Sequence, residues 1–252
     1  MTVRIGTRGS KLALAQTEIV ANKLKGLGIE VEQKTVSTQG DEVTNVPLHE
    51  IGKQGVFVKA LDDAILNKEI DCAVHSMKDI PAIRPSGLVI AAILPRDSPA
   101  DFLAYFGPVS SVKIVGTSST RRKAQLLRHD PDLDIRDLRG NVDTRMRKLR
   151  EGQYNAIVLA EAGLQRLGLR IPGERLPPEK FVPTPNQGTI AVVSRADPSL
   201  MNARCRRFAS GYPGKKPKYA TTGRCTASAR SIAYASAGFS SARWVDCIQY
   251  RI

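Results

Sequence analysis

The sequence predicts an α/β fold with two domains, and three observations lead to this prediction. Short apolar segments that suit buried strands alternate with segments of helical periodicity. This alternation occurs in two runs, which a polar, proline-containing stretch at residues 95–99 separates. The chain has 252 residues, of which 42% are hydrophobic, so it is long enough to bury two cores of ordinary size.

The first run contains four predicted strands and two predicted helices. Strands are expected at residues 3–6, 29–37, 71–74 and 88–94. Ser10 suits the N-cap of a helix that Gly26 and Gly28 would end. The apolar side of this helix would carry Leu12, Ala15, Ile19 and Leu24. The second helix is indicated by the helical spacing of Phe57, Leu61, Ala64 and Ile65.

The second run repeats the pattern. Strands are expected at residues 113–116, 156–160 and 189–193. Residues 117–119 would open a helix that carries Ala124, Leu126 and Leu127. Asn141 would cap another helix, which extends through Met146 and Leu149. Strand–helix alternation of this kind predicts layered α/β domains with mostly parallel sheets.

The net charge of +14 is unevenly distributed along the chain. Residues 1–194 hold 27 Lys and Arg against 22 Asp and Glu, a balance of +5, whereas residues 195–252 hold 11 against 2, a balance of +9. Residues 201–252 are rich in Ala, Ser, Arg, Gly and Tyr, and they show neither helical nor strand periodicity. We therefore expect an atypical basic tail there, without a core of its own.

Composition argues against a membrane protein and against a metal site. No apolar run approaches the roughly 18 residues that a membrane helix needs, and the N-terminal residues resemble a strand more than a signal peptide. The expected location is the cytoplasm. The cysteines, which lack CxxC spacing, are Cys72, Cys205, Cys225 and Cys247. With only three histidines beside them, no metal site is predicted, and Cys72 is expected in the core.

Arginines occur at three places where a predicted strand passes into a predicted helix. These are Arg8 in residues 7–10, Arg121 and Arg122 in residues 116–122, and Arg139 and Arg145 in residues 139–145. The unpaired N–H groups and the dipole at a helix start favour an anion, and the guanidinium group matches carboxylates and phosphates. The three junctions together predict a small polyanionic ligand between two domains.

Other interpretations of these basic residues stay open at this point. A single junction of this kind is commonly no more than a helix cap. Duplex DNA binding would predict a contiguous basic helix or stripe. The short basic run formed by Arg145, Arg147, Lys148 and Arg150 is typical of a solvated helix face. We therefore expect no nucleic-acid partner.

Lys78 and Asp79 follow the predicted strand at residues 71–74. Side chains at the carboxyl end of a strand can reach a ligand in α/β proteins, and a carboxylate beside an ammonium group suits proton transfer. Adjacent Lys and Asp residues are also common on protein surfaces. The pair by itself is therefore compatible with either a catalytic or a surface role.

Six motifs in chain order resemble the porphobilinogen deaminase family. The central motif, HSMKDIP at residues 75–81, is similar to the family pattern HSxKDxP. The segment RIGTRGSKLALAQ at residues 4–16 is similar to the family's N-terminus. The remaining four are GTSS followed by the arginine pair at 116–122, LRGNV followed by TR at 138–145, AGL followed by RLG at 162–168, and PNQG at 185–188.

The resemblance implies hydroxymethylbilane synthase, a transferase of tetrapyrrole biosynthesis that joins four porphobilinogen molecules and releases ammonia. Family members use a dipyrromethane cofactor, which a thioether links to a cysteine. Asp79 would be the catalytic carboxylate that stabilises cationic pyrrole intermediates and assists proton transfer. The residues implied to bind cofactor and substrate are Arg8, Ser10, Phe57, Lys78, Ser119, Arg121, Arg122, Arg139, Arg145, Arg166 and Gln187. Gln54 stands where many relatives carry lysine.

The resemblance also implies two domains like those of type II periplasmic binding proteins, with a cleft between them and a small third domain. The first domain is expected at residues 1–95 plus 188–200 and the second at 96–187. The family's third domain holds the cofactor cysteine in a Gly-Gly-Cys loop, and residues 201–252 contain no such loop. No attachment cysteine is therefore identified. A shifted reading frame would explain this tail, and a divergent domain is the alternative.

Two functions follow from these observations. The leading one is hydroxymethylbilane synthase, expected to be a cytoplasmic monomer with porphobilinogen as its small-molecule partner. This chain is then expected to be inactive or nearly so, because the cofactor cysteine loop is missing. The alternative is a non-catalytic two-domain protein that keeps the cleft and binds a small polyanion.

Overall fold

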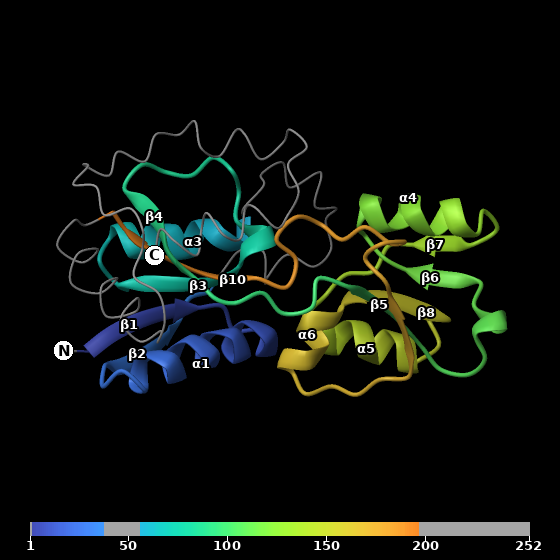
Figure 1. Ribbon diagram of the computed structural model, residues 1–252, viewed down its shortest axis with the longest axis horizontal. Coiled ribbons are helices and arrows are strands. Elements are labelled where there is room, and N and C mark those ends of the chain that lie inside the picture. The colour runs from blue at the N-terminus through green and yellow to red at the C-terminus, as the bar shows by residue number, and fades with distance from the viewer. Residues whose placement is uncertain (1, 38–55, 197–252) are drawn as a thin grey trace, which may run out of the picture.

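The computed structural model describes residues 2–37 and 56–196. In these ranges the chain forms two five-stranded sheets with their helices, which lie side by side along the long axis of the molecule (Figure 1). The predicted α/β class with two structural units is thereby confirmed. The tail at 201–252, which contains Cys205, Cys225 and Cys247, lies outside the described residues, as does Gln54.

The first sheet contains β1 (Thr2–Thr7), β2 (Glu30–Thr35), β3 (Cys72–Ser76), β4 (Leu88–Ile93) and β10 (Ile190–Arg195). Their order is β2-β1-β3-β10-β4. β1 pairs in parallel with β2 and β3, with Ile5 opposite Cys72. β10 runs antiparallel between β3 and β4, with Ala191 opposite His75. The return of the chain from the second half therefore completes the first sheet.

The second sheet contains β5 (Asp101–Tyr105), β6 (Ile114–Gly116), β7 (Asp134–Arg136), β8 (Ala156–Ala160) and β9 (Gly173–Leu176). Their order, β7-β6-β8-β5-β9, repeats the arrangement of the first sheet. A parallel set of three strands is followed by one antiparallel strand and an edge strand. The strands β5, β7 and β9 were not predicted from the sequence.

Both sheets are mixed, but the prediction of mostly parallel sheets holds for strand direction, because four of the five strands in each sheet run the same way. In each sheet the antiparallel strand is the one that arrives from the other sheet, β10 in the first and β5 in the second. The two connections, residues 94–100 and 177–189, pass in contact: the Asp97 N–H donates to the Gly188 carbonyl oxygen at 3.0 Å. A Cβ atom on Gly188, whose φ is +88°, would lie 2.6 Å from the Ser98 carbonyl oxygen.

Of the five helices in the described ranges, all except α6 (Glu161–Arg166) begin where the sequence predicts them. The others are α1 (Lys11–Lys25), α3 (Val56–Leu66), α4 (Thr120–His129) and α5 (Val142–Arg150), with the 3-10 turns η1 (Met77–Asp79) and η2 (Val109–Ser111). Ser10 caps α1 by accepting from the Ala13 N–H at 3.3 Å, and Ser119 caps α4 in the same way. Asn141 occupies the N-cap of α5 without a side-chain hydrogen bond.

The buried side of α1 differs from the predicted one. Val20, Ala21 and Leu24 are buried, whereas Leu12 and Ala15 are only half-buried. The reason is that the first turns of α1 border the space between the two sheets, where Leu12 lines a cavity. Only the later turns of the helix pack on the first sheet.

Each sheet has an apolar cluster on either face. In the first half, residues of α1 pack on one face of the sheet and residues of α3 on the other, around Ile5 and Leu61 respectively. In the second half, α5 and α6 cover one face, around Ile157, and α4 covers the other, around Val158. Full burial of each such side chain contributes about 1.5–3 kcal/mol. Cys72 lies in the first cluster, as predicted.

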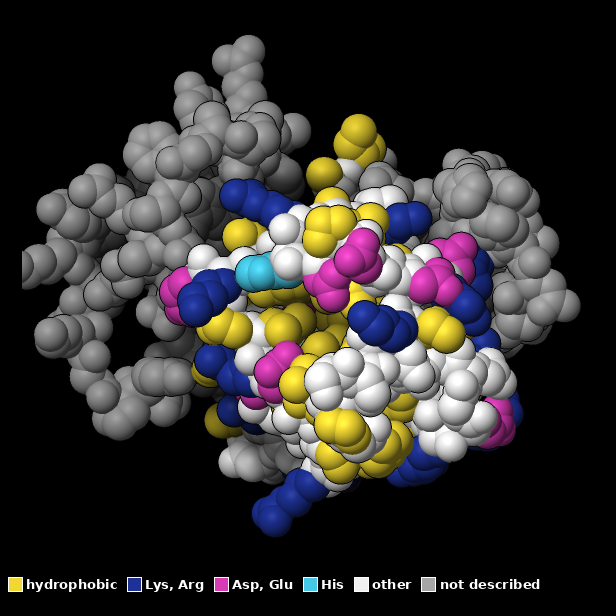
Figure 2. Space-filling model, turned by 90° about the vertical axis from the view of Figure 1, so that its right-hand side faces the viewer, with side chains coloured by type: hydrophobic (Ala, Val, Ile, Leu, Met, Phe, Trp, Pro, Cys, Tyr) yellow, Lys and Arg dark blue, Asp and Glu magenta, His cyan; other side chains and the backbone are white. Residues whose placement is uncertain are grey.

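The surface of the second half carries charges of both signs. Figure 2 shows its outer end, where Lys and Arg side chains are scattered among Asp and Glu rather than forming one stripe. Within the described parts of the chain, no helix is long and apolar enough to cross a membrane.

Candidate functional site

A cavity of about 270 Å³ lies between the two sheets and takes residues from both halves of the chain. Its wall includes the first turn of α1, the η1 turn and the first turn of α5. Because helix starts carry unpaired N–H groups and a positive dipole end, α1 and α5 add to the positive potential here. This wall contains the predicted catalytic residue Asp79 and the predicted binding residues Arg8, Ser10, Lys78, Arg122, Arg145 and Arg166.

A second cavity, of about 240 Å³, adjoins the first. It is lined by Lys78, Asp79, Ser119, Arg121, Arg122, Thr184 and Gln187. The two cavities share Lys78, Asp79 and Arg122. Asp79 is therefore the carboxylate at the junction of the two spaces, while the first cavity also has apolar walls and a second carboxylate, Asp143 of α5.

The η1 turn places Lys78 and Asp79 at this junction. It follows β3 directly, and its position is fixed because the Met77 N–H donates to the Thr189 carbonyl oxygen at 2.9 Å. The turn closes when the Ile80 N–H donates to the Met77 carbonyl oxygen at 3.2 Å. The local sequence thus ends a buried strand with two charged side chains that face the cleft.

Both charged groups have perturbed proton affinities. Their side chains reach solvent in the cleft, yet protein atoms surround them closely. This loss of hydration raises the pKa of the Asp79 carboxyl group, while Lys78 and Arg8 oppose the rise. The same loss of hydration lowers the pKa of Lys78, which Asp79 opposes. Asp79 is therefore better able to take part in proton transfer than an ordinary surface aspartate.

Arg145 is the most strongly perturbed cation of the cleft. Burial, together with the charges of Arg122 and Arg139, lowers its pKa to about 10. Its Nε donates to the Gly140 carbonyl oxygen at 2.7 Å. Arg139 is not among the described residues that line either cavity, but its charge acts on Arg145. A concentration of positive charge at this density favours a ligand with several carboxylates.

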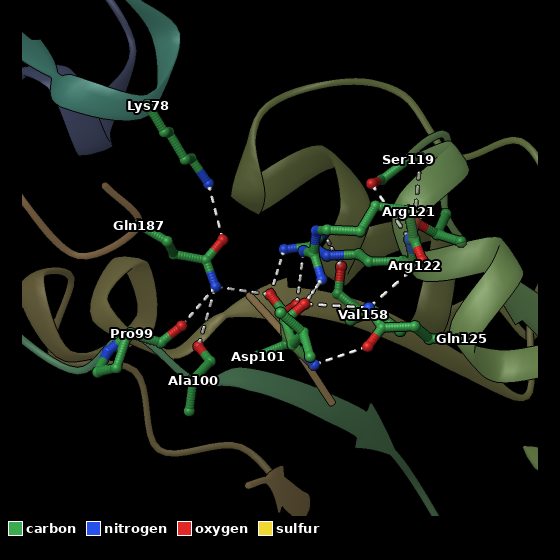
Figure 3. A network of polar contacts seen from close by, with 12 residues as sticks. Lys78, Pro99, Ala100, Asp101, Ser119, Arg121, Arg122, Gln125, Val158 and Gln187 are labelled. Carbon is green, nitrogen blue, oxygen red and sulfur yellow. Dashed lines mark hydrogen bonds and ion pairs between the residues drawn. The ribbon is translucent and has the colours of Figure 1, made fainter. Parts of the chain in front are cut away.

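Arg121 and Arg122 converge on the carboxylate of Asp101, the first residue of β5 (Figure 3). Nη2 of Arg121 lies 2.7 Å from Oδ2, and Nη2 of Arg122 lies 2.7 Å from Oδ1. The amide nitrogen of Gln187 donates to the same Oδ1 at 2.9 Å. Burial would raise the pKa of Asp101, but Arg122, Arg121 and Gln187 together hold it below its ordinary value.

Arg166 joins the two connections between the sheets. Its Nη2 lies 2.8 Å from the Asp97 carboxylate and 2.6 Å from the Gly188 carbonyl oxygen. The Arg166 side chain is buried even though it borders the first cavity. It therefore links both crossing segments to α6.

Phe57 is the one predicted binding residue whose side chain lies outside the described part of the chain. Its backbone belongs to the first turn of α3.

Three residues of the site were not predicted from the sequence. Asp101 was missed because β5 was missed, although an aspartate directly before an apolar run is a signal for such a position. Gln16 lines the first cavity and donates to the Ser76 hydroxyl at 2.9 Å. His75 is buried, and Nε2 has no partner among the described residues.

A cofactor with several carboxylates fits the donors in these walls. Nε of Arg122 is buried and has no partner within the described residues, so an acceptor is lacking beside the second cavity. Cys72 is buried in β3 and does not border either cavity. In residues 2–37 and 56–196 no group of three or more His, Cys, Asp or Glu could hold a metal ion.

Fold and cleft together define a two-domain α/β protein that is suited to binding a small polycarboxylate between its domains. The family model "Porphobilinogen deaminase, dipyromethane cofactor binding domain" matches residues 3–203. "Probable porphobilinogen deaminase" of Methanosarcina acetivorans is 55% identical over 202 residues, which cover 78% of this chain and 64% of that protein. Porphobilinogen deaminase of Bacillus subtilis is 44% identical over 220 residues, or 84% of this chain and 70% of that protein. The chain belongs to the porphobilinogen deaminase family.

The match does not extend over the whole length of the relatives. The chain spans 64% of the Methanosarcina acetivorans protein and 64% of that of Methanococcoides burtonii.

Among solved structures, the periplasmic molybdate-binding protein of Azotobacter vinelandii matches with a TM-score of 0.45 and 15% identity, over 84% of this chain and 93% of that one.

Proposed function

We propose that this chain is the substrate-binding part of a hydroxymethylbilane synthase, which joins four porphobilinogen molecules into hydroxymethylbilane and releases ammonia. One observation carries the proposal: the Asp79 carboxylate stands where two cavities meet, each of which has Lys78 and arginine side chains in its wall. Each porphobilinogen unit brings two carboxylates. A cleft that takes several linked units therefore needs many cationic donors and, near the reacting carbon, one negative group.

In this proposal the cationic residues bind and orient, and Asp79 acts at the reacting centre. Arg8, Arg145 and Lys78 hold substrate carboxylates, and Ser10 and Ser119 add hydroxyl donors at two helix starts. As the amine leaves porphobilinogen, positive charge develops on the pyrrole, and the Asp79 carboxylate stabilises it. The raised pKa of Asp79 supports a further role in moving the proton that the growing chain must lose.

The dipyrromethane cofactor would lie in the same cleft, where Ser119, Arg121, Arg122 and Lys78 are suited to its carboxylates. When bound, this group supplies the pyrrole end to which the first substrate unit is joined. The cysteine that would hold it is not found among the described residues, and Cys205, Cys225 and Cys247 lie outside them. Because residues 201–252 contain no Gly-Gly-Cys loop of the kind that holds the cofactor in the family, we expect this chain to bind porphobilinogen without turning it over.

The test combines calorimetry with mass measurement on the full chain. Porphobilinogen is titrated into the purified protein, and binding in the micromolar to millimolar range is expected. The intact mass is then measured after expression with porphobilinogen present, and no increase is expected. Absence of binding would refute the proposed function. A mass increase that matches a thioether-linked dipyrromethane would instead refute the expected inactivity, and peptide mapping would identify the cysteine.

Three further parts of the proposal concern organisation. We propose a first domain at residues 1–95 plus 188–200 and a second at 96–187, with a cytoplasmic monomer as the working form. Light scattering on the purified chain would measure its mass in solution. A mass of about 27.4 kDa supports the monomer, and twice this value contradicts it.

A further inference from the structure

The carboxylate of Asp101 is fully buried, at 0% exposure, and its side-chain hydrogen-bond donors among the described residues all belong to the cleft. Oδ1 accepts from Arg122 and Gln187, and Oδ2 accepts from Arg121. Asp101 itself is not among the described residues that line either cavity. It therefore acts on the cleft through these three side chains and not by direct contact with a ligand.

The two arginines are fixed at both ends of their guanidinium groups. Nη1 of Arg122 donates to the Val158 carbonyl oxygen at 2.8 Å, and Nη1 of Arg121 donates to the Val182 carbonyl oxygen. Asp101 occupies the Nη2 atom of each group. A long side chain held at two points has lost most of its rotamer freedom before any ligand arrives, which lowers the entropy cost of binding.

Gln187 extends this arrangement to the other domain. Its amide nitrogen donates to the Pro99 carbonyl oxygen at 2.8 Å as well as to Asp101, and its amide oxygen lies 3.4 Å from the Lys78 ammonium nitrogen (Figure 3). Lys78 belongs to the η1 turn after β3, whereas Asp101 begins β5 in the second sheet. The chain of contacts therefore crosses from one sheet to the other through both connections.

We propose that Asp101 is a positioning residue, which holds Arg121 and Arg122 toward the cleft and, through Gln187, sets the place of Lys78. The inference rests on the proposed function for its ligand. Without the negative charge of Asp101, the cations Lys78, Arg122 and Arg145 repel one another, and the arginines leave their places. The amide in Asp101→Asn keeps the shape of the side chain but presents a donor to one of the two arginines.

The test uses the full chain labelled with nitrogen-15 arginine and follows guanidinium N–H signals by NMR. In the parent, slowly exchanging signals of Arg121 and Arg122 are expected. In Asp101→Asn these signals should disappear, while those of Arg84, whose side chain is 11% exposed and pairs with Asp62 in the other domain, should persist and show that the fold is intact. Porphobilinogen affinity, measured by calorimetry, should fall at least tenfold.

Asp134→Asn is the matched control, because it makes the same chemical change in an exposed ion pair with Arg136. Affinity and arginine signals should stay within error of the parent. Unchanged signals in Asp101→Asn would overturn the inference, and so would lost signals with an affinity within twofold of the parent. Lost arginine signals with nearly unchanged affinity would show that Asp101 has a purely structural role.

Two other outcomes are also decisive. If Asp101→Asn also loses the Arg84 signals, the variant has unfolded, and Gln187→Met is tested in its place. Unchanged porphobilinogen affinity in Gln187→Met overturns the inference, and a loss of affinity of threefold or more supports it. If the parent does not bind porphobilinogen, the proposed function fails. The guanidinium signals of the parent and Asp101→Asn then decide by themselves whether Asp101 holds the arginines.

Discussion

The ammonium nitrogen of Lys78 lies 3.4 Å from the amide oxygen of Gln187, although 109 residues separate the two in the sequence. Lys78 follows β3 of the first sheet, and Gln187 lies in the connection that returns from the second sheet. The contact thus joins the residue next to Asp79 to the segment that sets the relative position of the sheets. A change in that position would move the cationic groups around Asp79 as well.

Asp79→Asn should abolish turnover in a version of this protein that is joined to a family-type third domain. Loss of the negative charge beside a cationic intermediate should cost several kcal/mol of transition-state stabilisation, or at least about a hundredfold in rate. The measurement is conversion of porphobilinogen to hydroxymethylbilane. Asp132→Asn, which changes an exposed carboxylate, is the control. Activity of Asp79→Asn within about tenfold of the parent would mean that this carboxylate is not central.

Arg145→Gln should weaken porphobilinogen binding by tenfold or more, because Arg145 lines the first cavity beside Lys78 and Arg122. Arg147→Gln makes the same change two residues away on α5, where the side chain is exposed and pairs with Glu151. That variant should bind within twofold of the parent. Calorimetry measures the porphobilinogen affinity of both variants and of the parent at two salt concentrations. The affinity of the parent should fall with added salt, because salt screens the attraction between charges. Equal affinities for the two variants would argue against carboxylate binding at Arg145.

His75 should make the protein less stable as the pH falls from about 6.5 toward 3. Burial, with the nearby charges of Arg84 and Arg8, lowers the pKa of this imidazole to about 3. The unfolded chain therefore binds a proton in this window that the folded chain does not, so the free energy of unfolding decreases with falling pH. Between pH 7 and pH 5 this amounts to about 2 kcal/mol.

Urea unfolding of the parent and of His75→Asn at pH 7 and pH 5 measures this contribution. The substitution removes the titrating group, so the loss of stability between the two pH values should be smaller by about 2 kcal/mol in the variant. The difference between the two proteins isolates His75 from other titrating groups. The same pH dependence in both would show that His75 titrates normally in the folded state.

Gly188→Ala should destabilise the protein more than Gly107→Ala. Both glycines have nearly the same φ, +88° and +89°, so the strain of placing alanine in the left-handed region, about 1–2 kcal/mol, is common to both. Only at Gly188 does the new Cβ meet backbone, at 2.6 Å from the Ser98 carbonyl oxygen, whereas Gly107 has open space. The excess cost, about 1–3 kcal/mol, is measured by urea unfolding. Equal costs would show that the two connections can separate.

Local signals in the sequence were sufficient for the starts of α1, α3, α4 and α5 and for most strands, but α6 was not predicted. Ser10 and Ser119 cap the helices that they were expected to cap, because N-capping depends on a hydroxyl and on backbone N–H groups three residues away. The short strand β7 and the edge strand β9 were not predicted, since three or four residues with mixed polarity carry no periodic signal. Burial on α1 was partly wrong, because the sequence does not show that its first turns face a cleft.

The sequence by itself determined the α/β class, the family resemblance and the choice of chemistry-bearing residues, such as Asp79 and Arg145. These depend on residue type and on neighbours close along the chain. Only the tertiary structure decided that Arg121 and Arg122 meet on Asp101, that Gln187 reaches Lys78, and that both sheets are mixed. These features arise where the chain crosses twice between the sheets, and contacts between segments that far apart leave no periodic pattern in one sequence.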